Sequence, residues 1–292
     1  MLFSPEQLLD HLPRQAAGWW LGVSGGLDSM VLLESVTRLS WQYSCPPIRV
    51  LHINHGLSTH ADGWQQQVRT TASRLGLPCE TVAVNVAKSE VKKNGLEAAA
   101  RKARYNAFAQ HLQVGQVLML AHHSDDQAET VLLRLLRGTG VAGLCAMSAQ
   151  RKLAAGQLCR PLLGFSRQQL HHWAVTEQLV WVDDPSNMES RFDRNFLRLY
   201  AMPLLISRWP KLQQRLSKTV AIMQQQQGLL DEVAAADCQA CQGASEAILT
   251  VSTLLALSLA RRHNVLRFWL AQQGQLAPTQ DQLMTIDRQV LQ

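Results

Sequence analysis

A short segment rich in serine and glycine, Ser24-Gly-Gly-Leu-Asp-Ser29, lies between a predicted strand and a predicted helix. Its two glycines allow the backbone to approach a ligand closely, and successive N–H groups at the start of a helix attract phosphate. Asp28 would repel a phosphate unless a divalent cation stood between them, so it is a candidate Mg²⁺ ligand. The segment predicts a site for a nucleotide polyphosphate with its metal. The plainer alternative is a tight turn with a capping Ser or Asp.

Two better-known phosphate motifs do not fit this chain. The Walker pattern needs Gly-Lys-Ser/Thr, and no lysine occurs between Ser24 and Ser35, so transfer of a γ-phosphate is disfavoured. A G-x-G-x-x-G pattern occurs at Gly138, Gly140 and Gly143, but it follows a predicted helix instead of a strand. We therefore expect a mobile loop there and no dinucleotide site.

Two carboxylates, Asp126 and Glu129, stand three residues apart on one face of a predicted helix start. They could hold a cationic amine and help to deprotonate it before attack. Alternatively they form a capping box, with Asp126 at the cap, and only satisfy the first N–H groups of the helix. This helix alone leaves both interpretations open.

Arginines and histidines supply two further patterns. Arg101, Arg104 and Arg194 are candidates to steady a reacting phosphate, because a guanidinium fork matches its oxygens; a solvated basic face is the alternative. Several histidines and aspartates could form a metal cluster of a phosphohydrolase. Its members would be His52, His55, His122, His123, Asp125 and Asp126. This interpretation is disfavoured because it leaves the segment 24–29 without a purpose.

Four short apolar runs are predicted to be buried strands, and segments with helical spacing lie between them. The runs are Gly18 to Val23, Ile48 to Ile53, Thr81 to Val86 and Val117 to Ala121; the helical segments are Met30 to Leu39, Gly63 to Leu75 and Leu96 to Leu112. Strands alternating with helices predict a Rossmann-like α/β fold, in which a parallel twisted sheet carries helices on both faces.

The helix after the fourth strand should begin near Asp126 and stop at Gly138. We expect its buried stripe to consist of Ala128, Val131, Leu132, Leu135 and Leu136.

The chain changes character near Pro210, where strand signals fade and helical, glutamine-rich segments begin. We therefore predict a first domain over 1–208 and a smaller all-helical domain over 211–292. The helical segments are Lys211 to Ala240, Ser252 to Gln272 and a helix after Pro278, with Thr279 and Gln282 as a capping box. That last helix has no stop signal, so we expect either a frayed end or a piece of a longer chain.

Composition places the protein among globular chains. It has 292 residues, 47% of them hydrophobic, and a net charge of +6, which is weak support for a nucleic-acid or nucleotide partner. Six scattered cysteines and the lack of a leader favour a reducing compartment, the cytoplasm. No apolar run reaches the roughly 18 residues of a membrane span, so we expect no membrane partner.

Five segments in chain order resemble known families. Ser24–Ser29 matches every fixed position of SGGxDS, the signature of the PP-loop ATP pyrophosphatases. The other four resemble motifs of the tRNA(Ile)-lysidine synthetases. His52-Ile-Asn-His55-Gly-Leu is similar to the motif H-V-N-H-x-L, and the segment Leu96–Tyr105 is similar to E-x-x-A-R-x-x-R-Y. The segment Ala121–Thr130 is similar to H-H-x-D-D-Q-x-E-T. Asp184-Pro-Ser-Asn187, together with Arg194-Asn195 and Arg198, is similar to D-x-S-N…R-N-x-x-R. The resemblance covers about Gly18 to Arg198.

This resemblance implies a fold of the adenine nucleotide α-hydrolase type and an ATP- and Mg²⁺-dependent ligase. Such an enzyme adenylates the C2 oxygen of the wobble cytidine in the CAU anticodon of an isoleucine tRNA, and free L-lysine then displaces AMP to give lysidine. The ATP-binding loop would be Ser24, Gly25, Gly26, Leu27, Asp28 and Ser29, with Asp28 on the metal. Asp126 and Glu129 would bind lysine, while Arg104 and Arg194 would act on the reacting phosphate. His52, Asn54, His55, Arg101, Asn195 and Arg198 would complete the RNA side of the site.

Two rival functions and two departures from the family accompany this interpretation. Another adenylating enzyme, such as a thiolation enzyme or an amide-forming synthetase, is disfavoured because Cys238 and Cys241 lie in the helical region with no second pair. A nucleotide- or RNA-binding module without turnover is disfavoured by the intact Asp28. Ser58 stands where many family members have Arg, and longer members carry a further C-terminal domain for tRNA. A candidate RNA face in the helical region consists of Arg261, Arg262, His263 and Arg267. The sequence leaves open whether the protein forms a homodimer.

Overall fold

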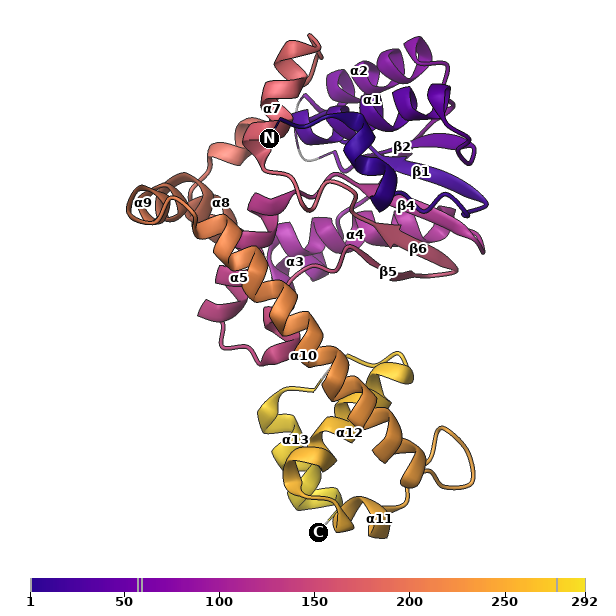
Figure 1. Ribbon diagram of the computed structural model, residues 1–292, viewed down its shortest axis with the longest axis vertical. Helices are drawn as coiled ribbons and strands as arrows, with labels where there is room; N and C mark the ends of the chain where they lie inside the picture. The colour runs from indigo at the N-terminus through magenta and orange to yellow at the C-terminus, as the bar shows by residue number, and fades with distance from the viewer. Residues whose placement is uncertain (1, 57, 59, 277, 292) are drawn as a thin grey trace. The chain divides into compact units, whose positions relative to one another are not determined.

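The computed structural model describes residues 2–56, 58, 60–276 and 278–291 (Figure 1). The chain divides into two compact units, the first comprising Met1–Arg137 with Ala146–Ser217 and the second Gly138–Cys145 with Lys218–Gln292. The division falls inside one long helix, α10 (Leu212–Ala240). Leu57 of the H-G-L segment and Gln292 of the expected last helix lie outside the described residues.

The strands of the described chain form one sheet of six in the first unit, in the order β3-β2-β1-β4-β6-β5. Neighbours are parallel except β5 and β6, which form an antiparallel hairpin at one edge. The strands are β1 (Gly18–Gly22), β2 (Ile48–Asn54), β3 (Cys79–Ala83), β4 (Gln116–Leu120), β5 (Gln150–Leu153) and β6 (Gly156–Cys159). The α/β fold predicted from the sequence is therefore confirmed, while the hairpin was not predicted.

Helices cover both faces of this sheet and create two cores. On one face, α1, α2 and α7 pack with the 3₁₀ helix η1 around Trp19 and Leu21 of β1. On the other face, α4 packs Phe108 against Trp20, Leu118 and Leu158. Within the predicted helical segment Met30 to Leu39, the apolar residues Met30, Leu33, Val36 and Leu39, each about one turn apart, are buried in the first core. Because both faces of the strands are covered, their carboxyl ends are left as the open edge for a site.

The helices of the first unit are η1 (Pro5–His11), α1 (Leu27–Gln42), α2 (Ala61–Arg74), α3 (Lys88–Asn94), α4 (Leu96–His111), α5 (Ser124–Leu136), α7 (Arg167–Thr176), η2 (Pro185–Met188), α8 (Asp193–Phe196), the π-helical turn η3 (Leu197–Ala201) and α9 (Met202–Arg208). Of these, α1, α2, α4 and α5 were predicted and lie close to their predicted positions, whereas the others were not predicted. A π turn within a run of helix is frequent at functional sites.

Helix α5 differs from its prediction at both ends. His123 is its N-cap and forms the capping box with Asp126, so the expectation that Asp126 caps the helix with Glu129 is wrong. Near the other end, Leu135 and Leu136 are exposed, because the helix buries only its first two turns, including Ala128 and Val131. Gly138, with φ +70°, follows the end of the helix as predicted.

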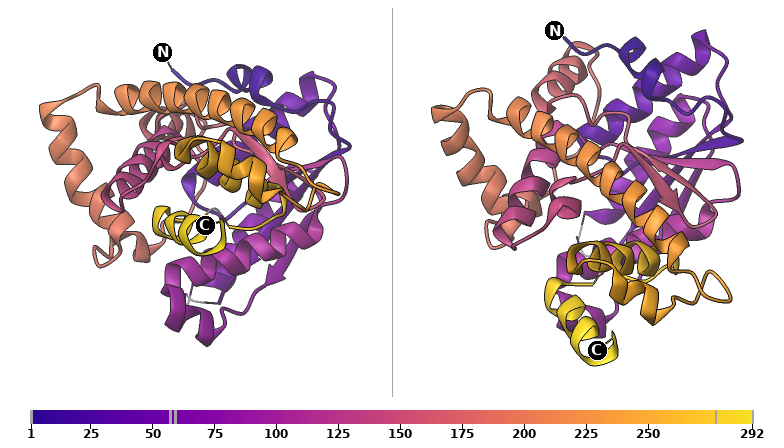
Figure 2. Two further views of the ribbon diagram at one scale, coloured as in Figure 1. Left: turned by 90° about the horizontal axis from the view of Figure 1, so that it is seen from below. Right: turned by 60° about the horizontal axis from the view of Figure 1, so that its bottom comes forward.

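The second unit is helical, as Figure 2 shows, and has its own small core around Cys241, Leu254, Val265, Leu266 and Leu283. Its other helices are α6 (Val141–Leu144), α11 (Val251–Ala256), α12 (Leu259–Gln272), α13 (Gln280–Ile286) and the π turn η4 (Asp287–Leu291). The single helix expected over Ser252 to Gln272 is interrupted at Leu257, which is extended and precedes the N-cap of α12. The glycine pattern after α5 contains the short helix α6, where only a loop was expected. The Thr279 capping box is confirmed.

The basic face expected on α12 is wrong for two of its members. Arg262 is buried and pairs with Asp287, and His263 is buried as well. Arg261 pairs with Asp237, so its charge is balanced within the unit. Cys241 is buried and Cys238 half-buried, as expected for small packing residues. Among the described residues, no helix is long and apolar enough to cross a membrane.

Candidate active site

The segment Ser24–Ser29 forms a tight loop from β1 into α1. Gly25 has a φ of +95°, and a Cβ there would lie 3.3 Å from Val182 Cγ2, so both backbone and space require glycine. The Ser29 hydroxyl donates to the Gly26 carbonyl at 2.8 Å and lies 3.2 Å from the Ser24 hydroxyl. The first turn of α1 therefore presents its N–H groups beside two hydroxyls, which suits phosphate oxygens.

A cavity of about 370 Å³ opens above this loop, at the carboxyl ends of β1, β2 and β4. Of the residues proposed from the sequence, the lining includes Ser24, Gly26, Leu27, Asp28, Ser29, His52, Asn54, His55, Arg104, Asp126 and Arg198. Gly25, Arg101, Glu129, Arg194 and Asn195 are not part of the lining. The structure thus gathers most of the candidate residues around one space and places five of them behind or beside it.

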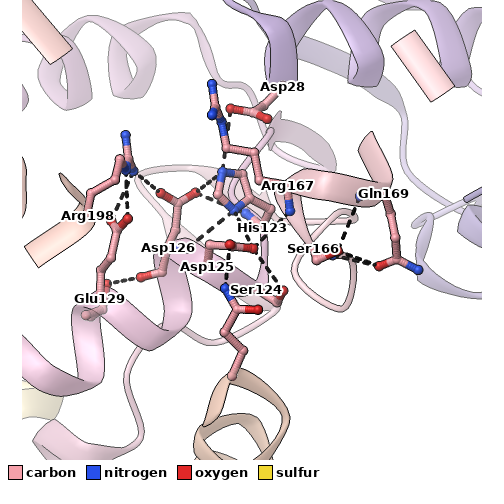
Figure 3. A network of polar contacts seen from close by, with 12 residues as sticks. Asp28, His123, Ser124, Asp125, Asp126, Glu129, Ser166, Arg167, Gln169 and Arg198 are labelled. Atoms are coloured by element: carbon pink, nitrogen blue, oxygen red, sulfur yellow. Dashed lines mark hydrogen bonds and ion pairs between the residues drawn. The ribbon is translucent and has the colours of Figure 1, made fainter. Parts of the chain in front are cut away.

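Asp28 faces the cavity from the first turn of α1 and meets His123, the N-cap of α5 (Figure 3). Its Oδ2 atom lies 3.5 Å from His123 Nε2, whereas its Oδ1 atom is buried with no hydrogen-bond partner among the described residues. An ionised oxygen without a partner is costly unless a cation or donor binds it. This atom therefore fits a role as a Mg²⁺ ligand, since Mg²⁺ is commonly held by one or two carboxylates together with phosphates and waters.

His123 connects the loop to the acidic start of α5. Its imidazole is 2% exposed, and its Nε2 atom lies 3.4 Å from Asp126 Oδ2 as well as near Asp28. Burial alone would lower the pKa of His123, but the carboxylates of Asp126 and Asp28 raise it above its ordinary value. His123 thus holds two acidic side chains from different elements in fixed positions.

Asp126 and Glu129 form a closed cluster with two arginines of the α8–η3 segment. Arg194 Nε donates to Glu129 Oε2 at 2.7 Å, and its Nη2 donates to Asp126 Oδ1 at 2.9 Å. Arg198 Nε donates to Glu129 Oε1 at 2.7 Å, and its Nη2 donates to Asp126 Oδ1 at 3.2 Å. Two carboxylates and two guanidinium groups therefore balance one another beside the cavity.

The charge state of Asp126 follows from this cluster. Burial would raise the pKa of Asp126, but His123 and Arg194 lower it to about 2. Asp126 is therefore ionised throughout the neutral range. A carboxylate with so low a pKa is a weak base, so it is suited to holding a cation and poorly suited to removing a proton.

The residues after β2 organise one wall of the cavity. His52 is buried, its Nδ1 lies 2.8 Å from the Val23 carbonyl, and burial lowers its pKa. Asn54 Nδ2 donates to Asp62 and Gln65 at 3.2 Å each. His55 is half-buried, and burial followed by the charge of Arg104 lowers its pKa. These side chains fix the position of the β2 end and leave a neutral wall.

The arginines of α4 take different positions. Arg104 lines the cavity, and neither a hydrogen bond nor an ion pair joins its guanidinium to any described residue. Arg101 lies outside the cavity, where its Cζ atom is 4.9 Å from the centroid of the Tyr105 ring. Asn195 donates to the carbonyls of Ser186 and Glu189 and so shapes the segment before α8. Arg104 is thus the α4 arginine available to an anion in the cavity.

Sequence reasoning missed several lining residues as parts of a nucleotide site, among them His122, His123 and Arg167. His122 and His123 were considered only as metal ligands, although their place directly after β4 is a signal for the carboxyl edge of the sheet. Within the described residues, no three His, Cys, Asp or Glu side chains are arranged to hold a metal ion by themselves. Arg167 comes from the start of α7, where the sequence offers no motif.

Comparisons of the sequence with known proteins identify two domains. The PP-loop domain matches residues 4–205, and the TilS substrate binding domain matches residues 249–292. The tRNA(Ile)-lysidine synthase of Pseudomonas aeruginosa is 44% identical over 268 residues, which cover 89% of this chain and 60% of that protein. The tRNA(Ile)-lysidine synthase of Pectobacterium atrosepticum is 43% identical, covering 96% of this chain and 63% of that protein. The chain thus spans about three fifths of the length of these relatives.

A comparison of structures agrees with the fold. The U34-tRNA thiolase NcsA from Methanococcus maripaludis superposes with a TM-score of 0.59 over 75% of this chain and 78% of that chain, at 15% identity. At this identity the likeness concerns the fold alone. The domain match covers more than half of the chain and includes the whole of the cavity described above. The chain therefore belongs to the PP-loop family, and its sequence is similar to tRNA(Ile)-lysidine synthases.

Proposed function

We propose that this protein is an ATP-dependent ligase that joins L-lysine to C2 of the wobble cytidine in the CAU anticodon of an isoleucine tRNA. The products would be lysidine, AMP and pyrophosphate. The observation that carries this proposal is one cavity that joins the Ser24–Ser29 loop, with its unpartnered Asp28 oxygen, to the charge-balanced cluster around Asp126. The similar tRNA(Ile)-lysidine synthases support the choice of substrates.

The loop is assigned to the pyrophosphate part of ATP. The N–H groups at the start of α1 and the hydroxyls of Ser24 and Ser29 would bind the β- and γ-phosphate oxygens. Asp28 would hold Mg²⁺, which when bound neutralises the charge that collects on the leaving pyrophosphate. Without a cation, Asp28 would repel the same phosphates, so its place in the loop argues for metal-bound ATP.

Arg104 is assigned to the phosphate that reacts. Its guanidinium lines the cavity, and no described carboxylate lies within ion-pair distance to neutralise it, so its full charge is available to an anion. A fixed guanidinium stabilises the charge that develops on phosphorus oxygens as the cytidine oxygen attacks. Arg194 was expected to act on the same phosphate, but it is not part of the cavity lining and pairs with Asp126 and Glu129, so we propose that it holds these carboxylates in place for the amine.

The acidic cluster is assigned to lysine. A free amino acid carries an ammonium and a carboxylate, and a cluster of two carboxylates and two guanidinium groups can pair with both charges. Since Asp126 stays ionised well below neutral pH, it would orient an ammonium group and leave the removal of a proton to water or phosphate. His52, Asn54, His55, Arg101, Asn195 and Arg198 would position RNA or shape the site around it.

The remaining parts of the proposal concern the setting of the enzyme. We propose that 1–208 carries the adenylation chemistry and that 211–292 serves tRNA binding, in keeping with the substrate-binding domain matched at 249–292. A cytoplasmic location and a homodimer belong to the same proposal. Sedimentation of the purified chain would test the dimer directly.

The test is release of pyrophosphate from ATP and Mg²⁺, measured with and without lysine and with and without the isoleucine tRNA. The intact chain should release pyrophosphate only when that tRNA is present, and Asp28→Ala should remove this release. Asp10→Ala, which deletes an exposed carboxylate on η1 outside the cavity lining, is the matched control and should behave as the intact chain. Release that does not depend on tRNA, or that survives in Asp28→Ala, would contradict the proposal.

A further inference from the structure

Four arginines gather around one tyrosine next to the cavity, and the assignments made so far leave most of them without a role. Tyr105 and its neighbours Arg101 and Arg104 come from α4, while Arg151 lies on β5 and Arg160 directly follows β6. We call these five residues the Tyr105 cluster. The unpredicted β5–β6 hairpin supplies two of its four cations.

The arginines are held by the ring and hydroxyl of Tyr105. The Cζ atoms of Arg101 and Arg151 lie 4.9 and 5.4 Å from the ring centroid, which is the range of cation–π contacts. Arg101 Nη2 also donates to the Tyr105 hydroxyl at 3.4 Å, while Arg160 is 4% exposed and donates to the Ser148 carbonyl at 2.6 Å. Two guanidinium groups therefore cover the tyrosine ring, which leaves little of it free to stack on a base.

The charge of the cluster is not balanced. Among the described residues, none of its four guanidinium groups has a carboxylate within ion-pair distance; Glu97 acts on Arg104 only from further away. Elsewhere in the unit, Arg49 packs over Trp20 in the same manner but is paired with Glu80 at 3.6 Å. The buried Nε atom of Arg160 has no hydrogen-bond partner in the part of the chain that the structure describes. Burial, and then repulsion between neighbouring arginines, lowers the pKa of Arg104 and of Arg160.

This arrangement runs from the surface into the cavity. Arg101 and Arg151 are exposed, Arg160 is buried, and Arg104 lines the cavity. A chain of negative charges spaced along a backbone would relieve the repulsion at more than one of these points. An isolated anion would relieve it at only one.

We propose that the two exposed arginines of the Tyr105 cluster, Arg101 and Arg151, bind backbone phosphates of the RNA strand next to the nucleotide that enters the cavity, while Arg104 faces the reacting phosphate inside it. This proposal rests on the proposed function, because it takes the RNA substrate from there. Phosphate is the favoured group over a base, since the ring of Tyr105 is already covered and guanidinium groups donate to phosphate oxygens in pairs. The contacts would position the strand without reading its sequence.

The test compares Arg151→Gln with two controls that remove the same single charge. The first control is Lys152, the next residue on β5. Side chains alternate along a strand, so Arg151 and Leu153 point to one face of the sheet, where Leu153 packs in the α4 core, and Lys152 points to the other face. Arg49 is the cation that Glu80 already balances. The probe is an anticodon stem-loop RNA with a CAU anticodon, bound to the full 292-residue chain at several salt concentrations.

Loss of one phosphate contact should reduce the slope of log K against log salt by about 0.7 to 0.9. At 0.15 M salt this corresponds to about fivefold weaker binding, and Arg101→Gln/Arg151→Gln should bind about twentyfold more weakly. Lys152→Gln and Arg49→Gln should change the slope by less than half as much. In Arg151→Gln the KM for ATP should be unchanged, because its side chain lies outside the cavity.

Three results would overturn the proposal. The first is an equal loss of affinity in Arg151→Gln and in both controls, which would indicate only a net-charge effect. The second is a raised KM for ATP with normal RNA binding, and the third is no binding of the stem-loop by the unchanged chain. Failure of the proposed function is a different result: Arg151→Gln would weaken RNA binding as described, but the intact chain would show no tRNA-dependent release of pyrophosphate.

Discussion

Replacing Glu129 with glutamine removes one charge from the buried cluster and leaves its shape almost unchanged. Glu129 is 2% exposed and accepts three charge-assisted hydrogen bonds, at 2.7, 2.7 and 3.0 Å, from Arg194 and Arg198. In the variant, two guanidinium groups would share the single carboxylate of Asp126. Removal of one partner from a buried ion pair costs about 3 to 5 kcal/mol. Because the arginines are 22% and 31% exposed, we expect about 3 kcal/mol.

The measurement is urea unfolding followed by tryptophan fluorescence. Of the eight tryptophans, all but Trp269 lie in the first unit, so the signal reports the unit that holds the cluster. Combining Glu129→Gln with Arg198→Gln completes a double-mutant cycle. The double variant should lose about 2 kcal/mol less than the sum of the single variants, since the second change removes the cation that the first left without a partner.

A matched control sits on the surface of the same unit. Glu177 also pairs with an arginine, Arg38, at 2.6 Å, but both side chains are about one third exposed. Glu177→Gln should therefore cost less than about 1 kcal/mol. If Glu129→Gln cost no more than this control, or if its effect simply added to that of Arg198→Gln, the cluster would not be a coupled buried unit and the reasoning would be refuted.

Three further changes test other parts of the first unit. Gly25→Ala should raise the KM for ATP at least tenfold, because φ is +95° there and the new Cβ would press on Val182; kinetics of pyrophosphate release check this. Gly156→Ala should lower the free energy of unfolding by about 2 kcal/mol in urea titrations, since its Cβ would lie 2.5 Å from the Gln116 carbonyl oxygen. Burial lowers the pKa of His122 to about 3, so between pH 6.5 and 3 only the unfolded chain gains this proton and stability falls as pH falls. At pH 5 the loss should be about 2 kcal/mol relative to pH 7, and His122→Asn should abolish that part of the pH dependence in urea titrations.

The central strands and their helices were predictable because their signals are local. The runs at Gly18, Ile48 and Val117 are apolar and buried on both faces, and each is bounded by turn residues. The hairpin β5–β6 was not predictable from the sequence, because each of its strands has only four residues. The sequence of β5 is Gln-Arg-Lys-Leu, an exposed edge without an apolar pattern. The hairpin joins the sheet only through the pairing of β6 with β4, and β4 is distant from it in sequence.

The Ser24–Ser29 loop was also predictable, because its signals are local in the sequence. The surroundings of Asp126 and Glu129 were predictable only in part. Gly25 and Asp28 act through the backbone and the helix start to which they belong, so spacing alone indicates their chemistry. Asp126 and Glu129 were found as a pair, but the helix could not say whether they cap it or bind a cation. That choice depends on Arg194 and Arg198, which lie 65 or more residues away in the sequence.

The structure shows that Asp126 takes part in both the helix cap and an ion cluster, whereas Glu129 takes part in the cluster alone. His123 takes the cap of α5 with Asp126 at the third position, which leaves one Asp126 oxygen and both Glu129 oxygens for the arginines. The capping box and the ion cluster therefore coexist at Asp126, and neither of the two interpretations from the sequence was complete. It follows that Asp126→Ala should impair both helix start and cluster, whereas Glu129→Gln should impair the cluster alone. A loss of α5 protection from hydrogen exchange in the first variant, and normal protection in the second, would separate the two roles.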